Sequence, residues 1–211
     1  MKKKVVVLGS GGHAKVVIEI IQAMGTFDLI GVTTLDPLIT DSFFGVPVLG
    51  NDSILPKLRK EGVETVAIGI GGYTNNNIRK EVYLNAKNLG FNCVAVVHPT
   101  AIISPSAKIG EGSVIFPGAI IHTDSVIGNN VIVATGSTID HDTKISDHVL
   151  VSAGVSVGAN VQIGESSLLA IGSTVITGMK IGTHCLIAAG AVVVKNVLDG
   201  QKIYGVPGKP K

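Results

Sequence analysis

A six-residue period runs through the second half of the chain without a break. From Val97 to Val193 every sixth residue is Ile, Val or Leu, which gives seventeen aliphatic positions in succession. Neither the two-residue period of a strand nor the 3.6-residue period of a helix selects such a series. A repeat of six closes a triangular coil from three short faces, each with one inward aliphatic side chain. At three hexads per coil, the series predicts a β-helix of about five to six coils.

A second series of residues follows each aliphatic position by four, and most of its members are small. It begins Ala101, Ala107, Ser113 and Ala119 and ends at Val197. We expect these small residues to turn the corners of the coils. The composition agrees with this architecture, because aromatic residues make up only 4% of the chain and glycine accounts for 27 of its 211 residues.

The first part of the chain has a different pattern, in which short apolar runs alternate with amphipathic segments. This alternation predicts a small, parallel, Rossmann-like sheet covered by helices. The expected strands are 4–8, 29–34, 63–68 and 91–97, and the expected helices are 13–24, 77–88 and a short helix capped by Asp52 that ends at Lys60. We therefore divide the chain into an α/β domain (1–96), a β-helix domain (97–198) and a C-terminal tail (199–211).

Charge, hydropathy and cysteine content exclude several classes of protein. The net charge of +2 is too small for a nucleic-acid-binding surface, and no apolar run approaches the length of a membrane span. Cys93 and Cys185 form no metal-binding spacing, so we expect two reduced thiols in a cytoplasmic protein. His148 and His184 lie two coils apart, which is too far to share a zinc ion, and we expect no metal.

A glycine-rich segment, Gly9-Ser10-Gly11-Gly12-His13-Ala14, links the first expected strand to the first expected helix. Glycines in such a turn let the backbone approach a ligand, and the N–H groups at a helix N-terminus attract an anion. Asp36 follows the second strand, where a carboxylate can accept bonds from sugar hydroxyls. The alternative is a turn that serves only to pack the helix on the strand.

The segment Ile139-Asp140-His141-Asp142-Thr143 interrupts the hexads with charge. Ile139 points inward, so His141 falls at a corner, where it is either part of a solvated surface run or a base whose pKa is raised by carboxylates. Residues eighteen apart stack on adjacent coils, which places Thr123, His141 and Ala159 in one column, with His122 beside Asp140. A contact between His141 and Asp142 requires corner geometry, because sequence neighbours in a regular strand point apart.

Three motifs together carry a resemblance to a known family: the glycine-rich segment, the unbroken hexads and the terminal Gly205-Val206-Pro207-Gly208-Lys209. The chain resembles the sialic-acid and nucleotide-amino-sugar acetyltransferases, which include bacillosamine and perosamine N-acetyltransferases. The resemblance implies a left-handed β-helix, acetyl-CoA as co-substrate and a homotrimer with CoA between two β-helices. It also implies a nucleotide-linked amino sugar, such as a 4-amino-4,6-dideoxy sugar, bound by the first domain.

The resemblance also implies roles for individual residues. His141 is the expected general base, Asp142 its hydrogen-bond partner and the Ala159 N–H the oxyanion donor. The expected contacts of the nucleotide sugar are Gly9, Ser10, Gly11, His13, Asp36 and Gly69. Small residues on a late-coil edge suit a pantetheine arm, although hexads favour small residues at turns in any case. With the C-terminal lysines, the expected CoA contacts are Ile171, Gly172, Ala188, Ala189, Gly190, Lys209 and Lys211.

The sequence departs from the family at one position, because Leu150 stands where members usually carry a second histidine. This departure puts in doubt any role of that histidine in holding the acetyl carbonyl. The expected function is N-acetylation of a nucleotide-linked amino sugar by direct attack on the thioester. The alternatives are O-acetylation of sialic acid or another sugar, and a scaffold or nucleotide-sensing module without catalysis.

Overall fold

A computed structural model describes residues 2–72 and 76–210 of the chain. These residues form two compact units. Unit 1 contains residues 2–72 and 77–99, and unit 2 contains Asn76 and residues 100–210.

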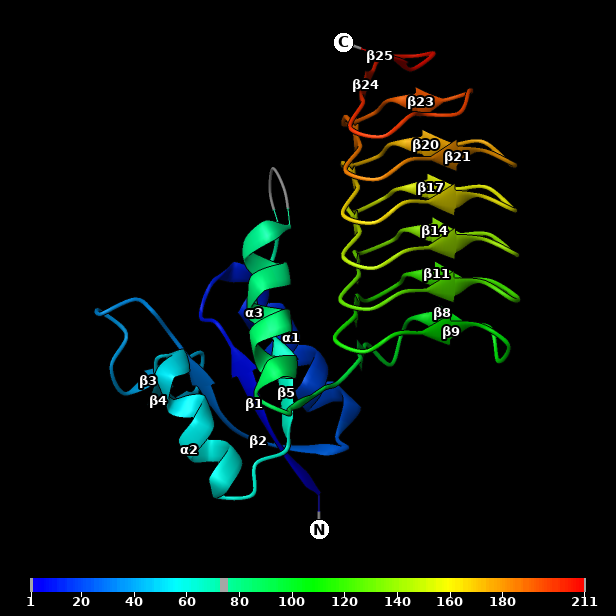
Figure 1. Ribbon diagram of the computed structural model, residues 1–211. Helices are drawn as coiled ribbons and strands as arrows, with labels where there is room; N and C mark the ends of the chain where they lie inside the picture. The colour runs from blue at the N-terminus through cyan, green and yellow to red at the C-terminus, as the bar shows by residue number, and fades with distance from the viewer. Residues whose placement is uncertain (1, 73–75, 211) are drawn as a thin grey trace. The chain divides into compact units, whose positions relative to one another are not determined.

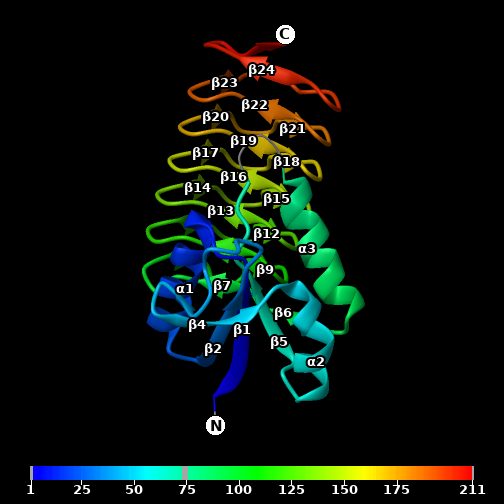
Figure 2. The same ribbon diagram turned by 90° about the vertical axis from the view of Figure 1, so that its left-hand side faces the viewer.

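Unit 1 is a largely parallel sheet with helices (Figures 1 and 2), and its strand order is β3-β4-β2-β1-β5-β6. All neighbouring strands in it are parallel except β3 and β4, which form an antiparallel hairpin. The strands are β1 (Lys3–Leu8), β2 (Phe27–Thr33), β3 (Ser42–Phe43), β4 (Val46–Gly50), β5 (Thr65–Ile68) and β6 (Asn92–Cys93), and β7 (Val96–Val97) follows. The helices are α1 (Gly12–Met24), a 3-10 turn η1 (Asp52–Ile54), α2 (Leu55–Lys60) and α3 (Asn77–Asn88).

The Rossmann-like sheet expected for this part of the chain is confirmed, with three local differences. The side chain of Asn51, and not that of Asp52, caps the 3-10 turn by accepting a hydrogen bond from Ser53 N at 2.9 Å. The run 91–97 forms two short strands in place of one. The hairpin β3–β4 lies in a stretch for which no strand was expected.

Unit 2 is a β-helix whose coils stack along one axis (Figure 1), as the six-residue period predicts. Strands on adjacent coils are parallel and eighteen residues apart, as in the pairing of Ile121 with Ile139, except that β22 and β24 are sixteen residues apart. The first face contains β8 (Ile102–Ile103), β11 (Ile120–Ile121), β14 (Thr138–Ile139), β17 (Ser156–Val157), β20 (Thr174–Val175) and β23 (Val192–Val193). The second face contains β9 (Lys108–Ile109), β12 (Val126–Ile127), β15 (Lys144–Ile145), β18 (Gln162–Ile163) and β21 (Lys180–Ile181). The third face contains β10 (Val114–Ile115), β13 (Ile132–Val133), β16 (Leu150–Val151), β19 (Leu168–Leu169), β22 (Leu186–Ile187) and β24 (Lys202–Tyr204), which pairs with β25 (Lys209–Pro210).

The aliphatic series fills the interior of the β-helix, and its members from Ile115 to Val193 are all buried. The small residues of the second series do not turn the corners, contrary to expectation, because most of them are also buried inside. Ser125, for example, is 0% exposed, and its hydroxyl donates to Asp140 O at 2.8 Å. The turns are made by the two residues before each small residue. The second of these takes a positive φ, with values of 55° at Asp124, 58° at Asp142 and 61° at His148.

Candidate active site

The six residues expected to contact a nucleotide sugar meet at one edge of the sheet in unit 1. Gly9, Ser10, Gly11 and His13 follow β1, Asp36 follows β2, and Gly69 follows β5. These three strands are adjacent and parallel, so their carboxyl ends lie along the same edge. Such an edge is where open α/β sheets bind their ligands.

Two of the glycines in this group are required by packing. Gly9 has φ +112°, and a Cβ there would lie 2.5 Å from Ile70 Cδ1. A Cβ on Gly69 would lie 2.8 Å from Leu8 O and 3.1 Å from the Cβ of Ala14. The fold itself therefore requires glycine at both positions, and neither of them is evidence of a ligand.

The other two glycines of the turn have no such packing role. A Cβ on Gly11 or Gly12 would meet no atom within 4 Å. Gly11 is the N-cap of α1, no side chain of residues 2–72 or 76–210 caps this helix end, and its first turn contains no acidic residue. The N-terminus of α1 thus presents an uncapped positive end beside open space, which suits an anionic group.

Polar side chains connect the turn to the end of β2. The hydroxyls of Ser10 and Thr34 are 2.5 Å apart, and Thr34 Oγ1 accepts a hydrogen bond from Asp36 N at 3.0 Å. One carboxylate oxygen of Asp36 accepts from Leu38 N at 2.9 Å. Asp36 is therefore held at the sheet edge by its own turn.

Sequence reasoning missed one residue of this group, Arg79 in the first turn of α3. Its side chain is 0% exposed, and Nη1 donates to Ile68 O at 3.1 Å and Ile70 O at 2.6 Å. The same nitrogen lies 3.4 Å from His13 Nε2. Burial lowers the pKa of Arg79 to about 9. Burial, together with the charge of Arg79, lowers the pKa of His13 to about 3.

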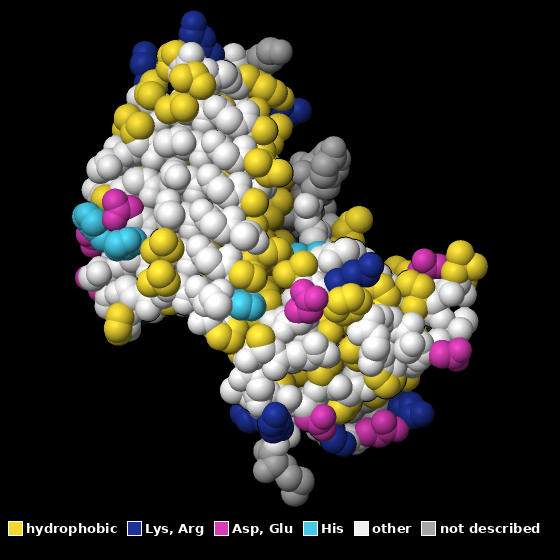
Figure 3. All heavy atoms as spheres, turned by 180° about the vertical axis from the view of Figure 1, so that it is seen from behind, with side chains coloured by type: hydrophobic (Ala, Val, Ile, Leu, Met, Phe, Trp, Pro, Cys, Tyr) yellow, Lys and Arg dark blue, Asp and Glu magenta, His cyan; other side chains and the backbone are white. Residues whose placement is uncertain are grey.

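In unit 2, His141 and Asp142 form the corner that follows β14. His141 Nδ1 lies 2.8 Å from Asp142 Oδ2, and the two side chains are 55% and 60% exposed. The contact between these sequence neighbours arises because Asp142 has φ 58°, the corner geometry that the sequence reasoning required. Figure 3 shows histidine and acidic side chains gathered at one edge of the β-helix.

The hydrogen bond to Asp142 raises the pKa of His141 above its ordinary value, and the charges of Asp140 and Asp142 add to the effect. Asp140 Oδ1 also accepts the backbone N–H of His141 at 2.7 Å. A carboxylate can only accept, so Nδ1 carries the proton and Nε2 is left with a lone pair. This arrangement can remove a proton from a substrate group.

The column predicted from the period is present, because Asp142 N donates to Thr123 O and Asn160 N donates to His141 O. Ala159 lies next to Asn160, and within the described part of the chain its N–H donates no hydrogen bond.

A groove of about 620 Å³ runs along the first face of unit 2. Another groove, of about 420 Å³, lies in unit 1. The groove of unit 2 is lined by His122, Asp140, Thr138, Ser156 and Thr174.

The expected CoA residues border the same face from its other side. Ile171 and Gly172 form the corner before β20, and Ala189 and Gly190 form the corner before β23, preceded by Ala188. A Cβ on Gly172 or Gly190 would meet no atom within 4 Å, so both corners are open. Lys209 lies apart from them in β25 and is exposed. Lys211 lies outside the described residues.

His148, His184 and Leu150 lie away from this corner of unit 2. His148 and His184 occupy the corner between the second and third faces, and Leu150 packs on the third face with Ile132 and Leu168. The described residues contain no group of three or more His, Cys, Asp or Glu that could bind a metal ion. Nor does any described helix have both the length and the apolar character needed to cross a membrane.

Two family models match the chain, one in the N-terminal α/β part and one in the β-helix. Residues 4–86 match the PglD N-terminal domain, and residues 106–141 match the bacterial transferase hexapeptide model of six repeats. UDP-N-acetylbacillosamine N-acetyltransferase from Bacillus subtilis (strain 168) is 33% identical over 120 residues. That match covers 53% of this chain and only half, 50%, of the length of the relative.

Solved structures match over nearly the full chain. The H141A mutant of GDP-perosamine N-acetyl transferase from Caulobacter crescentus, in complex with CoA and GDP-perosamine, is 36% identical with a TM-score of 0.92. That match covers 99% of this chain and 96% of the other. The acetyltransferase domain of PglB from Neisseria gonorrhoeae FA1090, in complex with acetyl coenzyme A, is also 36% identical, with a TM-score of 0.91 and 100% of both chains covered. The chain therefore belongs to the family of acetyltransferases that join a PglD N-terminal domain to hexapeptide repeats, as its sequence motifs led us to expect.

Proposed function

We propose that this protein transfers the acetyl group of acetyl-CoA to the amine of a nucleotide-linked amino sugar, of which a 4-amino-4,6-dideoxy sugar is the candidate. The observation that carries the proposal is the exposed His141–Asp142 pair, whose Nδ1···Oδ2 distance is 2.8 Å. Its Nε2 lone pair faces away from the carboxylate, as a general base requires. The family relatives that bind CoA and GDP-perosamine support both substrates.

In the proposed reaction, the sugar nitrogen attacks the thioester carbonyl while His141 Nε2 accepts a proton from it. Asp142 stabilises the resulting imidazolium, and the N–H of Ala159 donates to the oxyanion. The carbon–sulfur bond then breaks and CoA leaves as the thiolate. Proton transfer by a positioned base of this kind contributes typically ~10²–10⁴-fold to the rate.

The proposed acetyl donor site is the first face of unit 2. Its groove is lined by hydroxyls, and the open corners at Gly172 and Gly190 leave room for a pantetheine arm. The contacts assigned there are Ile171, Gly172, Ala188, Ala189 and Gly190, with Lys209 in the tail that closes the groove. We further propose a homotrimer, supported by exposed apolar side chains on the β-helix such as Ile102, 63% exposed, and Ile171, 66% exposed.

The proposed nucleotide site is the sheet edge of unit 1, in the domain we assign to residues 1–96. The open, uncapped N-terminus of α1 suits a diphosphate, and Asp36 suits a hydroxyl of the sugar or ribose. We place the protein in the cytoplasm, since its two cysteines are both buried in the fold and no disulfide is needed there.

The test is release of CoA thiol from acetyl-CoA with a panel of acceptors. The panel contains UDP-, dTDP- and GDP-linked 4-amino sugars and, beside them, free sialic acid. We expect release with one nucleotide-linked amino sugar and an N-acetylated product by mass spectrometry. Release with sialic acid alone would replace the proposal by O-acetylation, and no binding of acetyl-CoA would overturn an acyltransferase function.

A further inference from the structure

The N–H proposed for the oxyanion belongs to the peptide group that joins Gly158 to Ala159, and a buried hydroxyl bonds the other side of this group. Thr143 is 0% exposed, and its Oγ1 donates a hydrogen bond to Gly158 O at 2.9 Å. The same oxygen accepts the backbone N–H of Val161 at 3.2 Å. Because a hydroxyl has one hydrogen, that of Thr143 is committed to the Gly158 carbonyl.

The geometry of a peptide group then gives the direction of the Ala159 N–H. The bond between Gly158 and Ala159 is trans, so its carbonyl and its N–H lie in one plane and point in opposite directions. Since the carbonyl points at a hydroxyl inside the β-helix, the N–H points out of the interior. Among the described residues this N–H has no acceptor, and Gly158 lines the groove of the first face. The N–H is therefore available to a ligand in that groove.

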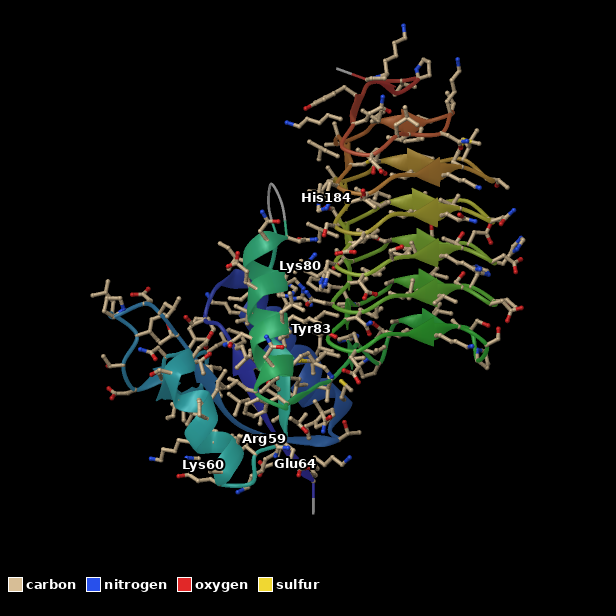
Figure 4. All side chains as sticks on the ribbon, viewed as in Figure 1. Arg59, Lys60, Glu64, Lys80, Tyr83 and His184 are labelled. Carbon is tan, nitrogen blue, oxygen red and sulfur yellow. The ribbon has the colours of Figure 1, made fainter. Side chains whose placement is uncertain are left out.

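A corner elsewhere in the β-helix has the same bond from a hydroxyl to a carbonyl, but there the N–H is occupied. Ser167 Oγ donates to Gly182 O at 2.8 Å, and the N–H of Thr183 donates to Asp199 Oδ1 at 2.7 Å. This corner also contains His184, which Figure 4 labels. The same arrangement, with the same two distances, is found earlier in the column at Ser113, Gly128, Asn129 and Asp147.

The corner that contains Ala159 differs in two ways, because its N–H is left open and because it stacks on the corner of the proposed base. Asn160 N donates to His141 O at 2.9 Å, which joins the two corners directly. The Ala153 N–H also donates no hydrogen bond within residues 2–72 and 76–210, but it lies at a different corner, between the third and first faces. The open N–H of Ala159 is thus the one that lies beside His141.

We propose that Thr143 is a positioning residue for acetyl transfer, whose hydroxyl holds the Ala159 N–H toward the oxyanion. A hydrogen bond accepted by a carbonyl also polarises its peptide group and strengthens the N–H as a donor. Thr143 therefore acts through the backbone, without touching the substrate. The inference rests on the proposed function, because the oxyanion forms only in that reaction.

The fold accepts residues without a hydroxyl at this position. Val161 occupies the equivalent position one coil later, where it is 0% exposed, and Ala107 occupies it two coils earlier. Thr143→Val and Thr143→Ala therefore both remove the hydroxyl with a side chain that the β-helix already contains there. Thr143→Ser keeps the hydroxyl. The matched control is Ser167→Ala, which removes the same kind of bond at the corner whose N–H is already accepted by Asp199.

The test is the steady-state release of CoA thiol with the active acceptor over a range of pH, with melting temperatures to show that each variant is folded. We expect Thr143→Val and Thr143→Ala to lower kcat by about tenfold or more, as partial loss of an oxyanion donor should. The KM values and the Kd of acetyl-CoA should stay near wild type, because the interaction is made in the transition state. The acidic limb should not move, since the hydroxyl does not touch His141. Thr143→Ser should restore most of kcat, and Ser167→Ala should retain it.

Three results would overturn the inference alone, because the wild type would still transfer acetyl. The first is an unchanged kcat in folded Thr143→Val. The second is an equal fall of kcat in Ser167→Ala, which would indicate general loosening of the β-helix. The third is an acidic limb that moves together with kcat, which would place the effect at the base. A wild type that releases no thiol with any acceptor would instead overturn the proposed function, and this inference with it.

Discussion

The pairing of His141 with Asp142 depends on the backbone conformation of one residue. Successive side chains of a strand point to opposite faces, so neighbours can meet only where the chain leaves the strand. Asp142 does this with φ 58°, in the left-handed region that Asp tolerates better than most side chains. The corner thus provides a base and its carboxylate from two consecutive residues.

We expect Asp142→Asn to shift the pH profile of activity. His141 acts as a base only when deprotonated, so activity falls as the pH drops through its pKa. The hydrogen bond to Asp142 raises that pKa, and its removal should therefore move the acidic limb of kcat/KM to lower pH. The plateau should also fall by about tenfold or more, because the imidazolium loses its partner.

The control for this prediction is Asp124→Asn, one coil earlier in the same corner column, where φ is 55°. It removes a carboxylate of the same kind without touching the pair, and should shift the limb much less. An acidic limb that does not move in Asp142→Asn would contradict the role of Asp142.

Individual residues differed in how well the sequence predicted them. His141 and Asp142 could be singled out because charge interrupts a strict period, and their contact was expected on condition that they form a corner. Arg79 could not be found in this way, since a cation in an amphipathic helix normally lies in water with its charge exposed. Only the fold shows that α3 turns this side chain inward, toward carbonyls at the end of β5.

Among the structural elements, the turn between β1 and α1 contains two kinds of glycine: one that the fold requires, and others that it does not require. Gly9 has φ +112° and a would-be Cβ 2.5 Å from Ile70, whereas Gly11 has φ −91° and no neighbour within 4 Å. Gly9→Ala should therefore cost about 1–3 kcal/mol of stability. Gly11→Ala should change stability by less than about 1 kcal/mol, because the preference for glycine over alanine at an N-cap opposes the gain from a less flexible unfolded chain.

The substitution Gly11→Ala, which should hardly affect stability, should nevertheless weaken ligand binding. A methyl group in the open space at the N-terminus of α1 should weaken nucleoside diphosphate binding by about tenfold or more, as the phosphates lose close approach to the backbone. Chemical denaturation and calorimetry measure the two effects separately. Unchanged diphosphate affinity in Gly11→Ala would show that this open space is not the binding site.

The elements themselves were predictable to different degrees. The aliphatic series predicted the β-helix because one inward residue per face is an unambiguous six-residue signal. The period alone does not show whether the series of small residues lies in the turns or points into the interior. For this reason these residues were wrongly expected at the corners, whereas most of them are buried. The β3–β4 hairpin was missed because its turn, Phe44-Gly45, lacks the usual Asn-Gly or Asp-Gly, and Phe44 nevertheless adopts φ 52°.

In the molecule as a whole, each unit has one proposed task. Unit 1 carries the proposed nucleotide site, and unit 2 carries the proposed base and acetyl donor groove. Family membership supports this division, since the two family models match separate stretches, 4–86 and 106–141. The sequence does not reveal which nucleotide and sugar are used, because that choice depends on contacts that periodicity does not encode.

The proposed trimer gives a direct prediction for the molecular mass in solution. Three chains of 21.7 kDa should give about 65 kDa by size-exclusion chromatography with light scattering. The mass should persist at the concentrations used for activity. A 21.7 kDa species that turns over at the full rate would contradict a groove shared between β-helices.

A single comparison of rates tests the proposed role of His141 as the base for acetyl transfer. The measurement is CoA-thiol release with the active acceptor for His141→Asn beside His184→Asn, the same substitution at an exposed histidine, labelled in Figure 4, in a different corner. We expect the rate to fall by ~10²–10⁴-fold in His141→Asn, with acetyl-CoA still bound, and to stay near the wild-type value in His184→Asn. A His141→Asn enzyme that retains most of its activity would contradict the mechanism.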